Sequence, residues 1–400
     1  MNKKRFWTAL TAVLMLFIST YAEENITLAN VFGRPLQWCV GVETSPAFVP
    51  GTTAFLKGTN PKNSAVHNSL SGTLRTNFSF DKNSHDGSLY TNVYQGIGIG
   101  ALSFFHHNLM GTPISAHVFQ GAPILHLNNR LWLGYEWKFG AAMGWKKYDV
   151  NTAGSNAPVS TSVTAHMAFG LRLNYSLSAN WLMTLGIEAS HYSNGNTSIP
   201  NAGVNSIGAI AGVSYLLNAP KEKKHHSKFE PDTDNHTKWF YDIMVYGSWR
   251  KKVVCVGSND DIPQIIPGRF GVLGFQFSPM RKLNQWIATG VALDVQYDES
   301  AGIAPYWVEG SFHDNVKFYR PPFIKQLSTG LSAHAELIMP IFAINAGLGF
   351  DILNPKGNKR FYQSLTLKTF VVRNVYLNVG YRLGNFNDPQ NLMLGLGIRL

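Results

Sequence analysis

The segment His191-Tyr192-Ser193-Asn194 holds the side chains of this chain that are best suited to chemistry. A serine hydroxyl becomes a good nucleophile when a neighbouring base takes its proton, and histidine suits that task near neutral pH. The Asn194 amide could donate a hydrogen bond to the oxyanion that forms when an ester carbonyl is attacked. The spacing therefore indicates a hydrolase with Ser193 as nucleophile and His191 as base.

Alternating side chains predict a β-strand leading into this segment. Every second residue of a strand shares a face, so His191 and Ser193 point the same way. The residues before them on that face are apolar: Trp181, Met183, Leu185, Ile187 and Ala189. On the outside of a membrane barrel this face would meet acyl chains. A lipid ester is therefore the expected substrate.

Patterns with a period of two residues run along most of the chain and predict further strands. Candidates in the first half lie at about 36–47, 68–80, 90–104, 113–126, 130–147, 161–177, 180–193 and 204–217. Candidates in the second half lie at about 239–254, 269–279, 284–297, 326–338, 341–351, 360–372, 375–384 and 391–400. The same alternation puts His166, Arg172 and Glu188 on the opposite face from His191, where we expect a buried polar network.

Composition favours a transmembrane barrel built from such strands. Only 14% of residues are charged, whereas aromatic residues make up 13% and there are 37 glycines. These proportions suit strands with one face in lipid and a glycine-rich lumen. After residue 22 no stretch is apolar over the roughly 18 residues that a membrane helix needs. The sequence thus predicts an all-β protein with an antiparallel transmembrane β-barrel.

The chain divides into four predicted parts. Residues 1–22 place basic residues before an apolar run and end it at a small residue, which is typical of a secretory signal peptide. Residues 23–217 form an eight-stranded module, the smallest common closed barrel, and residues 239–400 form a second, diverged module. Residues 218–238 are polar and without periodicity, which predicts a linker.

Charge and cysteine content argue against several classes of function. The formal net charge is +11, and five lysines and four acidic residues are concentrated in residues 221–238, but an exported chain is not expected to bind nucleic acid. His225 and His226 lie in this charged segment, so we expect no metal and no other cofactor. Cys39 and Cys255 lie on apolar segments, where packing is a commoner role than a disulfide.

The second half is predicted to repeat the first without its chemistry. Its last two candidate strands repeat the pattern found around His191. On that match Gly380 and Arg382 stand in place of His191 and Ser193, so the second module has no hydrolytic pair. The pattern fits two tandem barrels or one larger barrel, because both satisfy every backbone hydrogen bond. The linker favours tandem barrels.

The segments His191–Asn194 and Pro200–Gly203 resemble the outer-membrane lipid A 3-O-deacylases, the PagL-like family of eight-stranded barrels. The resemblance covers the signal peptide and residues 36–217. It implies an enzyme of the Gram-negative outer membrane that hydrolyses an acyl ester of lipid A. Lipopolysaccharide and outer-membrane lipids are then its expected partners, with the oligomeric state left open.

The resemblance also implies roles for individual residues. Ser193 becomes the nucleophile and His191 its base, while the Asn194 side chain and the backbone amide at Asn196 form the oxyanion hole. The family has a histidine-orienting glutamate where this chain has Asn205. By parity Asn205 shares the outward face and can lie across the hairpin from His191. An amide oxygen can hold the imidazole but cannot stabilise imidazolium as a carboxylate does, so slower turnover is expected.

Three functions are compatible with the sequence. The first is a lipid A 3-O-deacylase. The second is an acyloxyacyl hydrolase or phospholipase that cuts another lipid ester with the same pair. The third is a non-catalytic barrel that acts as a pore or assembly partner, which the missing glutamate and the extra strands favour.

Overall fold

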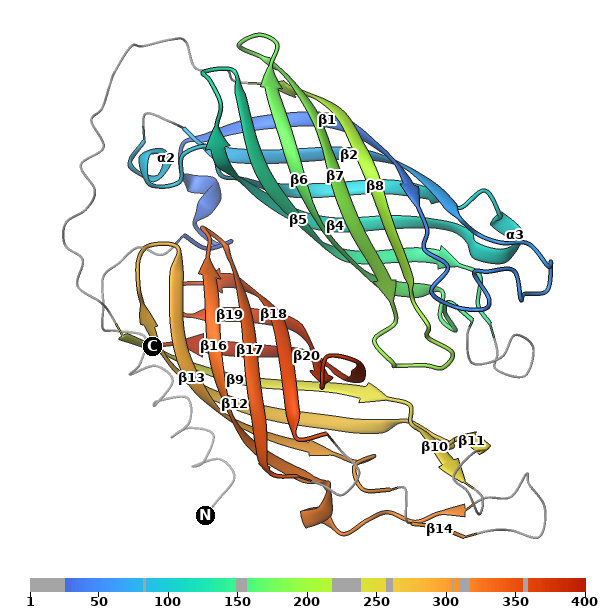
Figure 1. Cartoon of the computed structure of the whole chain (residues 1–400). Helices are drawn as coiled ribbons and strands as arrows, with labels where there is room; N and C mark the ends of the chain where they lie inside the picture. Colours follow the sequence, from blue (N-terminus) through green and yellow to red (C-terminus); the bar gives the residue numbers. More distant parts are fainter. Residues whose placement is uncertain are drawn as a thin grey trace. The chain divides into compact units, whose positions relative to one another are not determined.

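The computed structural model consists of two closed antiparallel β-barrels that share no strand (Figure 1). Residues 34–217 make one unit, and residues 26–33 belong with residues 239–400 in the other. The structure describes residues 26–81, 84–148, 157–217, 239–256, 262–303, 306–308, 317–354 and 359–400.

The first barrel contains eight strands in sequence order, and β8 closes it by pairing with β1. Its strands are β1 (Leu36–Phe48), β2 (Asn68–Phe80), β3 (Tyr94–Ser103), β4 (Gly111–His126), β5 (Leu131–Trp145), β6 (Val163–Ser176), β7 (Trp181–Ser193) and β8 (Val204–Leu216). The connections after β1, β3, β5 and β7 lie at one end, which we call the loop end. The other end is called the turn end.

The second barrel also has eight strands, and β20 closes it by pairing with β9. Its strands are β9 (Trp239–Arg250), β12 (Phe270–Lys282), β13 (Ile287–Asp298), β16 (Leu327–Ile338), β17 (Phe342–Leu353), β18 (Phe361–Val372), β19 (Val375–Gly384) and β20 (Asp388–Arg399). Here the connections after β9, β13, β17 and β19 form the loop end.

Short elements lie outside the barrels. The helices are η1 (Val31–Gly33), α2 (His85–Leu89), α3 (His107–Met110) and η2 (Phe323–Gln326). The two-stranded ribbons are β10 (Val253–Val256) with β11 (Ile262–Ile265), and β14 (Trp307–Val308) with β15 (Lys317–Phe318). Near the N-terminus, the Leu28 and Ala29 amides donate to carbonyls at the end of β18. This segment thus joins the second barrel, although the sequence placed residues 23–33 with the first.

The strand pattern and the fold class are confirmed. All sixteen predicted strands occur, most with ends within a few residues of the prediction, and they form two closed barrels, not one larger barrel. The predicted signal peptide and the predicted linker, residues 218–238, lie outside the described residues. Within the described residues no helix is both long and apolar enough to cross a membrane.

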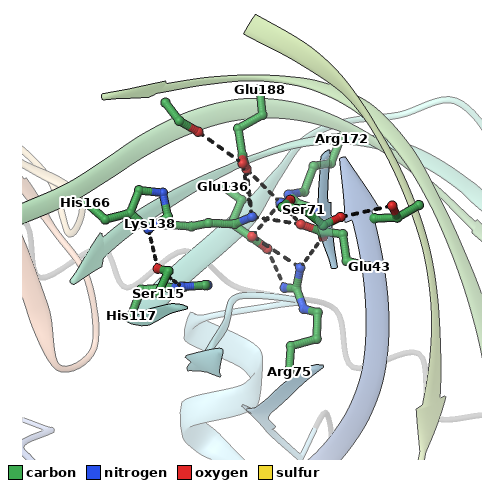
Figure 2. A network of polar contacts seen from close by, with 12 residues as sticks. Glu43, Ser71, Arg75, Ser115, His117, Glu136, Lys138, His166, Arg172 and Glu188 are labelled. Carbon is green, nitrogen blue, oxygen red and sulfur yellow. Dashed lines mark hydrogen bonds and ion pairs between the residues drawn. The ribbon is translucent and has the colours of Figure 1, made fainter. Parts of the chain in front are cut away.

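The lumen of the first barrel is filled by charged side chains that neutralise one another (Figure 2). Arg75 bridges Glu43 and Glu136 at 2.7 and 2.6 Å, and Arg172 reaches the same two carboxylates. Lys138 contacts Glu43 at 2.7 Å and Glu188 at 2.9 Å. His166, Arg172 and Glu188 therefore face inward, as the alternation predicted.

The predicted match of Gly380 and Arg382 to His191 and Ser193 is wrong, because the two pairs lie on opposite faces of their strands. Gly380 and Arg382 point into the second lumen, where Arg382 contacts Asp351 at 2.6 Å. His191 and Ser193 instead point outward, so these residues are not equivalent. The match followed residue identity around Tyr381, and a shift of one residue reverses every face of a strand. The outward face of β19 carries Val379 and Tyr381 there, neither of which can attack an ester.

Candidate active site

The β7–β8 hairpin brings together two of the predicted site residues. His191 and Asn205 are directly opposite each other in the antiparallel register. Their side chains meet on the outward face, where His191 Nδ1 lies 2.7 Å from Asn205 Oδ1. With the proton on Nδ1, the ring donates to the amide oxygen and leaves Nε2 as the base. The strand register therefore places an acceptor beside Nδ1 and favours the tautomer in which Nε2 is free to act as a base.

Ser193 lies two residues beyond His191, on the same outward face and half-buried. In the described part of the chain no hydrogen bond joins the two side chains. Gly203 stands beside both of them with a φ of +70°. A methyl group added there would lie 3.1 Å from His191 Cε1 and 3.6 Å from Ser193 Cβ. Glycine at this position thus allows the backbone to turn in the left-handed region and to approach the pair closely.

The loop after Ser193 begins with a tight turn that holds Asn194 and Asn196. Gly195 and Asn196 both have positive φ, and the Thr197 amide donates to the Asn194 carbonyl at 3.3 Å, as in a type I′ turn. Asn201 ties the turn together, because its Oδ1 accepts from the Asn194 amide and its Nδ2 donates to Asn196 Oδ1. Both asparagines of the predicted oxyanion hole are therefore held in place by Asn201.

The Asn194 side chain is buried and donates within the protein. Its Nδ2 donates to the Ser198 carbonyl at 3.0 Å and to Ser160 Oγ at 3.4 Å. The second of these is long for a hydrogen bond. Ser160 comes from the connection between β5 and β6, far from Asn194 in the sequence. Sequence reasoning missed Ser160, since no pattern links a serine there to this hairpin.

The outward surface around the pair is apolar and exposed. On β6, β7 and β8 it includes Phe169, Ile187 and Ile207, with exposed fractions of 56, 61 and 58%. Their side chains continue the apolar face that the sequence predicted. On a membrane barrel such a surface contacts acyl chains.

The described residues contain no group of three or more His, Cys, Asp or Glu side chains placed to hold a metal ion. Inside the barrel a small cavity of about 30 Å³ is lined by polar side chains, among them His117, His166 and Glu188. On β7 it is lined by inward-facing residues. His191 and Ser193 do not line it, so these two outward-facing residues and the cavity are separated by the barrel wall.

Two family models match the chain in succession. Residues 70–214 match the model of the lipid A 3-O-deacylase (PagL). Residues 239–400 match the model of the acyloxyacyl hydrolase C-terminal domain. The chain belongs to this PagL and acyloxyacyl hydrolase family. The family indicates a hydrolase that acts on lipid A esters in the Gram-negative outer membrane.

Other comparisons add little. A search of curated proteins found no match. A solved structure described as a de novo designed transmembrane β-barrel is 11% identical with a TM-score of 0.23, and the match covers 46% of this chain and 98% of that one. The siderophore receptor PirA from Acinetobacter baumannii is 7% identical with a TM-score of 0.23, covering 87% and 68%. At such scores the likeness carries no argument.

Proposed function

We propose that the protein is an outer-membrane serine esterase that removes an acyl chain from lipid A, with Ser193 as nucleophile and His191 as base. The observation that carries this proposal is the 2.7 Å contact between His191 Nδ1 and Asn205 Oδ1 on the apolar outer face. It turns an isolated His-x-Ser sequence into an oriented base beside a serine. Asn205 thereby takes the place of the family's glutamate.

The reaction proceeds in two halves. Ser193 Oγ attacks the ester carbonyl carbon while its proton passes to His191 Nε2. The bond to the sugar oxygen then breaks, and the imidazolium returns the proton to that oxygen. In the second half His191 takes a proton from water, and the hydroxide formed attacks the acyl-Ser193 ester. Free fatty acid leaves, and the proton returns to Ser193.

We assign the oxyanion hole to Asn194 Nδ2 and the backbone amide of Asn196. Nδ2 makes a weak contact with Ser160 Oγ at 3.4 Å, and a negatively charged oxygen is a better acceptor than a hydroxyl. The developing oxyanion can therefore replace this contact while the bond to the Ser198 carbonyl keeps the amide oriented. The absence of a His191–Ser193 hydrogen bond is compatible with catalysis, because such bonds often tighten only in the substrate complex.

The substrate reaches the site from the lipid side of the barrel. The first barrel has an even number of strands, so both of its ends lie on the same side of the membrane, which we take as the periplasmic side. β7 then runs outward, and the loop that follows it lies at the outer leaflet, where lipid A resides. The acyl chains then lie along Leu185 and Ile187 below the pair, both exposed on the outward face.

A second candidate reaction is hydrolysis of an acyloxyacyl ester, in which the acyl chain is attached to another acyl chain. It is favoured by the match of residues 239–400 to the acyloxyacyl hydrolase C-terminal domain. The same serine chemistry would serve both esters. The two reactions differ in the acyl chain that is lost, so the masses of the products separate them.

Mass spectrometry of lipid A tests the proposal. Cells that produce the protein should contain lipid A that lacks one acyl chain, and cells that produce Ser193→Ala should not. Ser190→Ala is the matched control, because Ser190 lies in the same strand but points inward, 3.5 Å from Glu188. Unchanged deacylation by a folded Ser193→Ala variant would rule out the proposed nucleophile.

A further inference from the structure

The loop end of the first barrel is covered by a cluster of buried apolar side chains, which we call the cap. The connections after β1, β3 and β5 contribute to it, together with strand ends that include those of β7 and β8. Its members are Val49, Phe55, Leu56, Val66, Leu102, Phe104, Leu109, Met110, Ala142, Trp145, Tyr148, Ala157, Val159, Tyr192 and Val204. The connections to which they belong lie at the same end of the barrel as α3 (Figure 1).

The cap includes the inward side of the reactive hairpin. Tyr192 stands between His191 and Ser193 and points the opposite way, with 4% of its surface exposed. It is paired across the hairpin with Val204, which is fully buried next to Asn205. Because successive side chains of a strand point to opposite faces, the orientation of Tyr192 determines where its two neighbours point.

Tyr192 is held between two aromatic rings. Its ring stacks on His166 with centroids 4.6 Å apart and an interplanar angle of 14°. On another side it meets Trp145 at 5.4 Å. Trp145 in turn packs on Phe104 at 5.5 Å. The hairpin is thereby packed against β5, β6 and the connection between β3 and β4.

The connection between β5 and β6 links the cap to the loop of the reactive hairpin. The Gly203 amide donates to the Pro158 carbonyl at 2.9 Å, and the Ala202 amide donates to the Ala157 carbonyl at 3.2 Å. Tyr148 packs on Phe55 at 4.8 Å, and its hydroxyl donates to the Leu109 carbonyl at 2.8 Å. Burial raises the pKa of the Tyr148 phenol, which keeps this donor protonated.

We propose that the cap is a positioning device for the ester hydrolysis, in which Tyr192 and Trp145 fix the inward side of the hairpin and so hold His191 and Ser193 in their reactive orientation. The proposal rests on the proposed function. Tyr192 and Trp145 are positioning residues, because they act through the hairpin backbone from the opposite face. Phe55, in the connection between β1 and β2, then helps to position His191 and Ser193 although it is far from them in the sequence.

The physical reason is the exposed position of the hairpin end. His191 and Ser193 lie where β7 ends and a loop begins, and strand ends without packing fray. Nucleophilic attack requires the reacting atoms within about 3–3.5 Å, and an error of about 1 Å can cost roughly 100-fold in rate. Buried packing on one face of the strand supplies this precision without obstructing the other face, which must stay open to the substrate.

The test uses the full-length protein with substitutions in the cap. Tyr192→Ala should lower kcat by roughly 10- to 100-fold with little change in KM, since the acyl-binding outer face is untouched. It should also slow covalent labelling of Ser193 by a small fluorophosphonate, which reports on the nucleophile without lipid binding. Tyr192→Phe keeps the aromatic ring and should restore both rates to near the wild-type values.

Two further variants guard against a folding defect. Heat-modifiable migration on gels shows whether the barrel has formed. Phe55→Ala removes a cap residue that has no aromatic contact with the hairpin itself, and it should slow Ser193 labelling severalfold in the folded protein. Tyr376→Ala removes a fully buried tyrosine of the second barrel, and labelling should stay at the wild-type rate.

The outcomes separate this inference from the proposed function. If Tyr192→Ala fails to fold, Phe55→Ala and Trp145→Ala decide, and both should slow Ser193 labelling severalfold in the folded protein. Wild-type kcat and labelling in folded Tyr192→Ala, or in folded Phe55→Ala and Trp145→Ala, would overturn the positioning role while leaving Ser193 as nucleophile. If Ser193→Ala retains activity, the proposed function itself fails, and the cap has no reactive pair to position.

Discussion

The apolar clusters of the two barrels, as far as the described residues show them, lie in different places. In the first barrel the largest described cluster lies at the loop end, under the hairpin of His191 and Ser193. In the second barrel the described clusters include Phe370 and Tyr376, and also Phe240 and Met280, which lie in the parts of their strands near the turn end. The described connections at the loop end of the second barrel also bury apolar residues, among them Ile266, Ala301 and Ile303. The cap of the first barrel includes the last hairpin, through Tyr192 and Val204.

The last hairpins of the two barrels also differ, in the length of the loop between their strands. In the first barrel a loop of residues 194–203 follows β7, whereas in the second only residues 385–387 separate β19 from β20. The short turn is closed by a hydrogen bond from the Asn387 amide to the Gly384 carbonyl at 3.1 Å. It has no room for a counterpart of the Asn194 and Gly203 loop.

The lumens, in contrast, are alike. The fourth barrel strand of each unit carries the same Ser-Ala-His sequence, Ser115-Ala116-His117 in β4 and Ser332-Ala333-His334 in β16. The serine and histidine contact each other inside both barrels, at 3.2 Å in the first and 2.8 Å in the second. His334 also meets Asn345 Oδ1, so a buried Ser-His-Asn chain exists in the second barrel without access to lipid. His191 and Ser193 differ from these buried serine-histidine contacts because they face outward from the barrel. Residue types alone therefore do not identify a site.

The largest expected effect contrasts the outward pair, His191 and Ser193, with the buried pair Ser332 and His334. Ser193→Ala and His191→Ala should each lower ester hydrolysis by roughly 10⁴-fold or more, because the nucleophile and its base act as a unit. Ser332→Ala, in the buried chain, should leave the rate within about twofold in protein that has folded, because it lies outside the reactive unit. Kinetic assays in detergent with purified lipid A measure both. A loss of activity in folded Ser332→Ala equal to that in Ser193→Ala would assign chemistry to the second barrel.

The next effect concerns the lumen charges. Arg172→Leu leaves Glu43 and Glu136 short of a partner in the first barrel, and Lys368→Leu does the same for Asp242 and Glu336 in the second. Removing one partner of a buried ion pair lowers the free energy of unfolding by about 3–5 kcal/mol. Each variant should therefore unfold at a lower temperature or a lower denaturant concentration. Only Arg172→Leu should reduce hydrolysis under mild conditions. Equal loss of activity in both variants would show that the barrels do not fold independently.

A smaller effect is expected at Asn205. Replacing it with glutamate supplies a charged acceptor for the His191 Nδ1 proton and should raise kcat severalfold, a gain of about 1 kcal/mol. Asn205→Ala removes the 2.7 Å contact and should lower kcat roughly 3- to 10-fold. Steady-state kinetics decide the matter. A slower glutamate variant together with an unchanged alanine variant would separate Asn205 from the reaction.

The smallest effect should follow removal of the second barrel. Since no strand is shared, a chain that ends at Leu217 should insert in the outer membrane and keep its turnover within a few-fold. Closed barrels leave no unpaired strand edge in lipid, which is the physical basis of this expectation. Gel migration and lipid A analysis provide the measurement. If the shortened protein cannot fold where the full chain folds, the second barrel is required for assembly.

The sequence predicted more of the fold than of the site. Alternation located the strands and assigned His166, Arg172 and Glu188 to the lumen, because which face a residue occupies is a local property of a strand. It failed for Arg382, where a similar motif was aligned one residue out of phase. It also identified Asn205 as the partner of His191, since two strands joined by one loop have few possible registers. Ser160 and Asn201, which orient Asn194, were not identified as support.

What the sequence determined by itself was the set of strands, their two faces and the hairpin that carries His191, Ser193 and Asn205. Only the tertiary structure decided that sixteen strands close as two barrels and that Trp145 contacts Tyr192 on the inward side of the hairpin. The reason is the range of the interactions. Strand periodicity is set by neighbouring residues, whereas barrel closure and the cap depend on contacts between segments far apart in the chain, which no local pattern encodes.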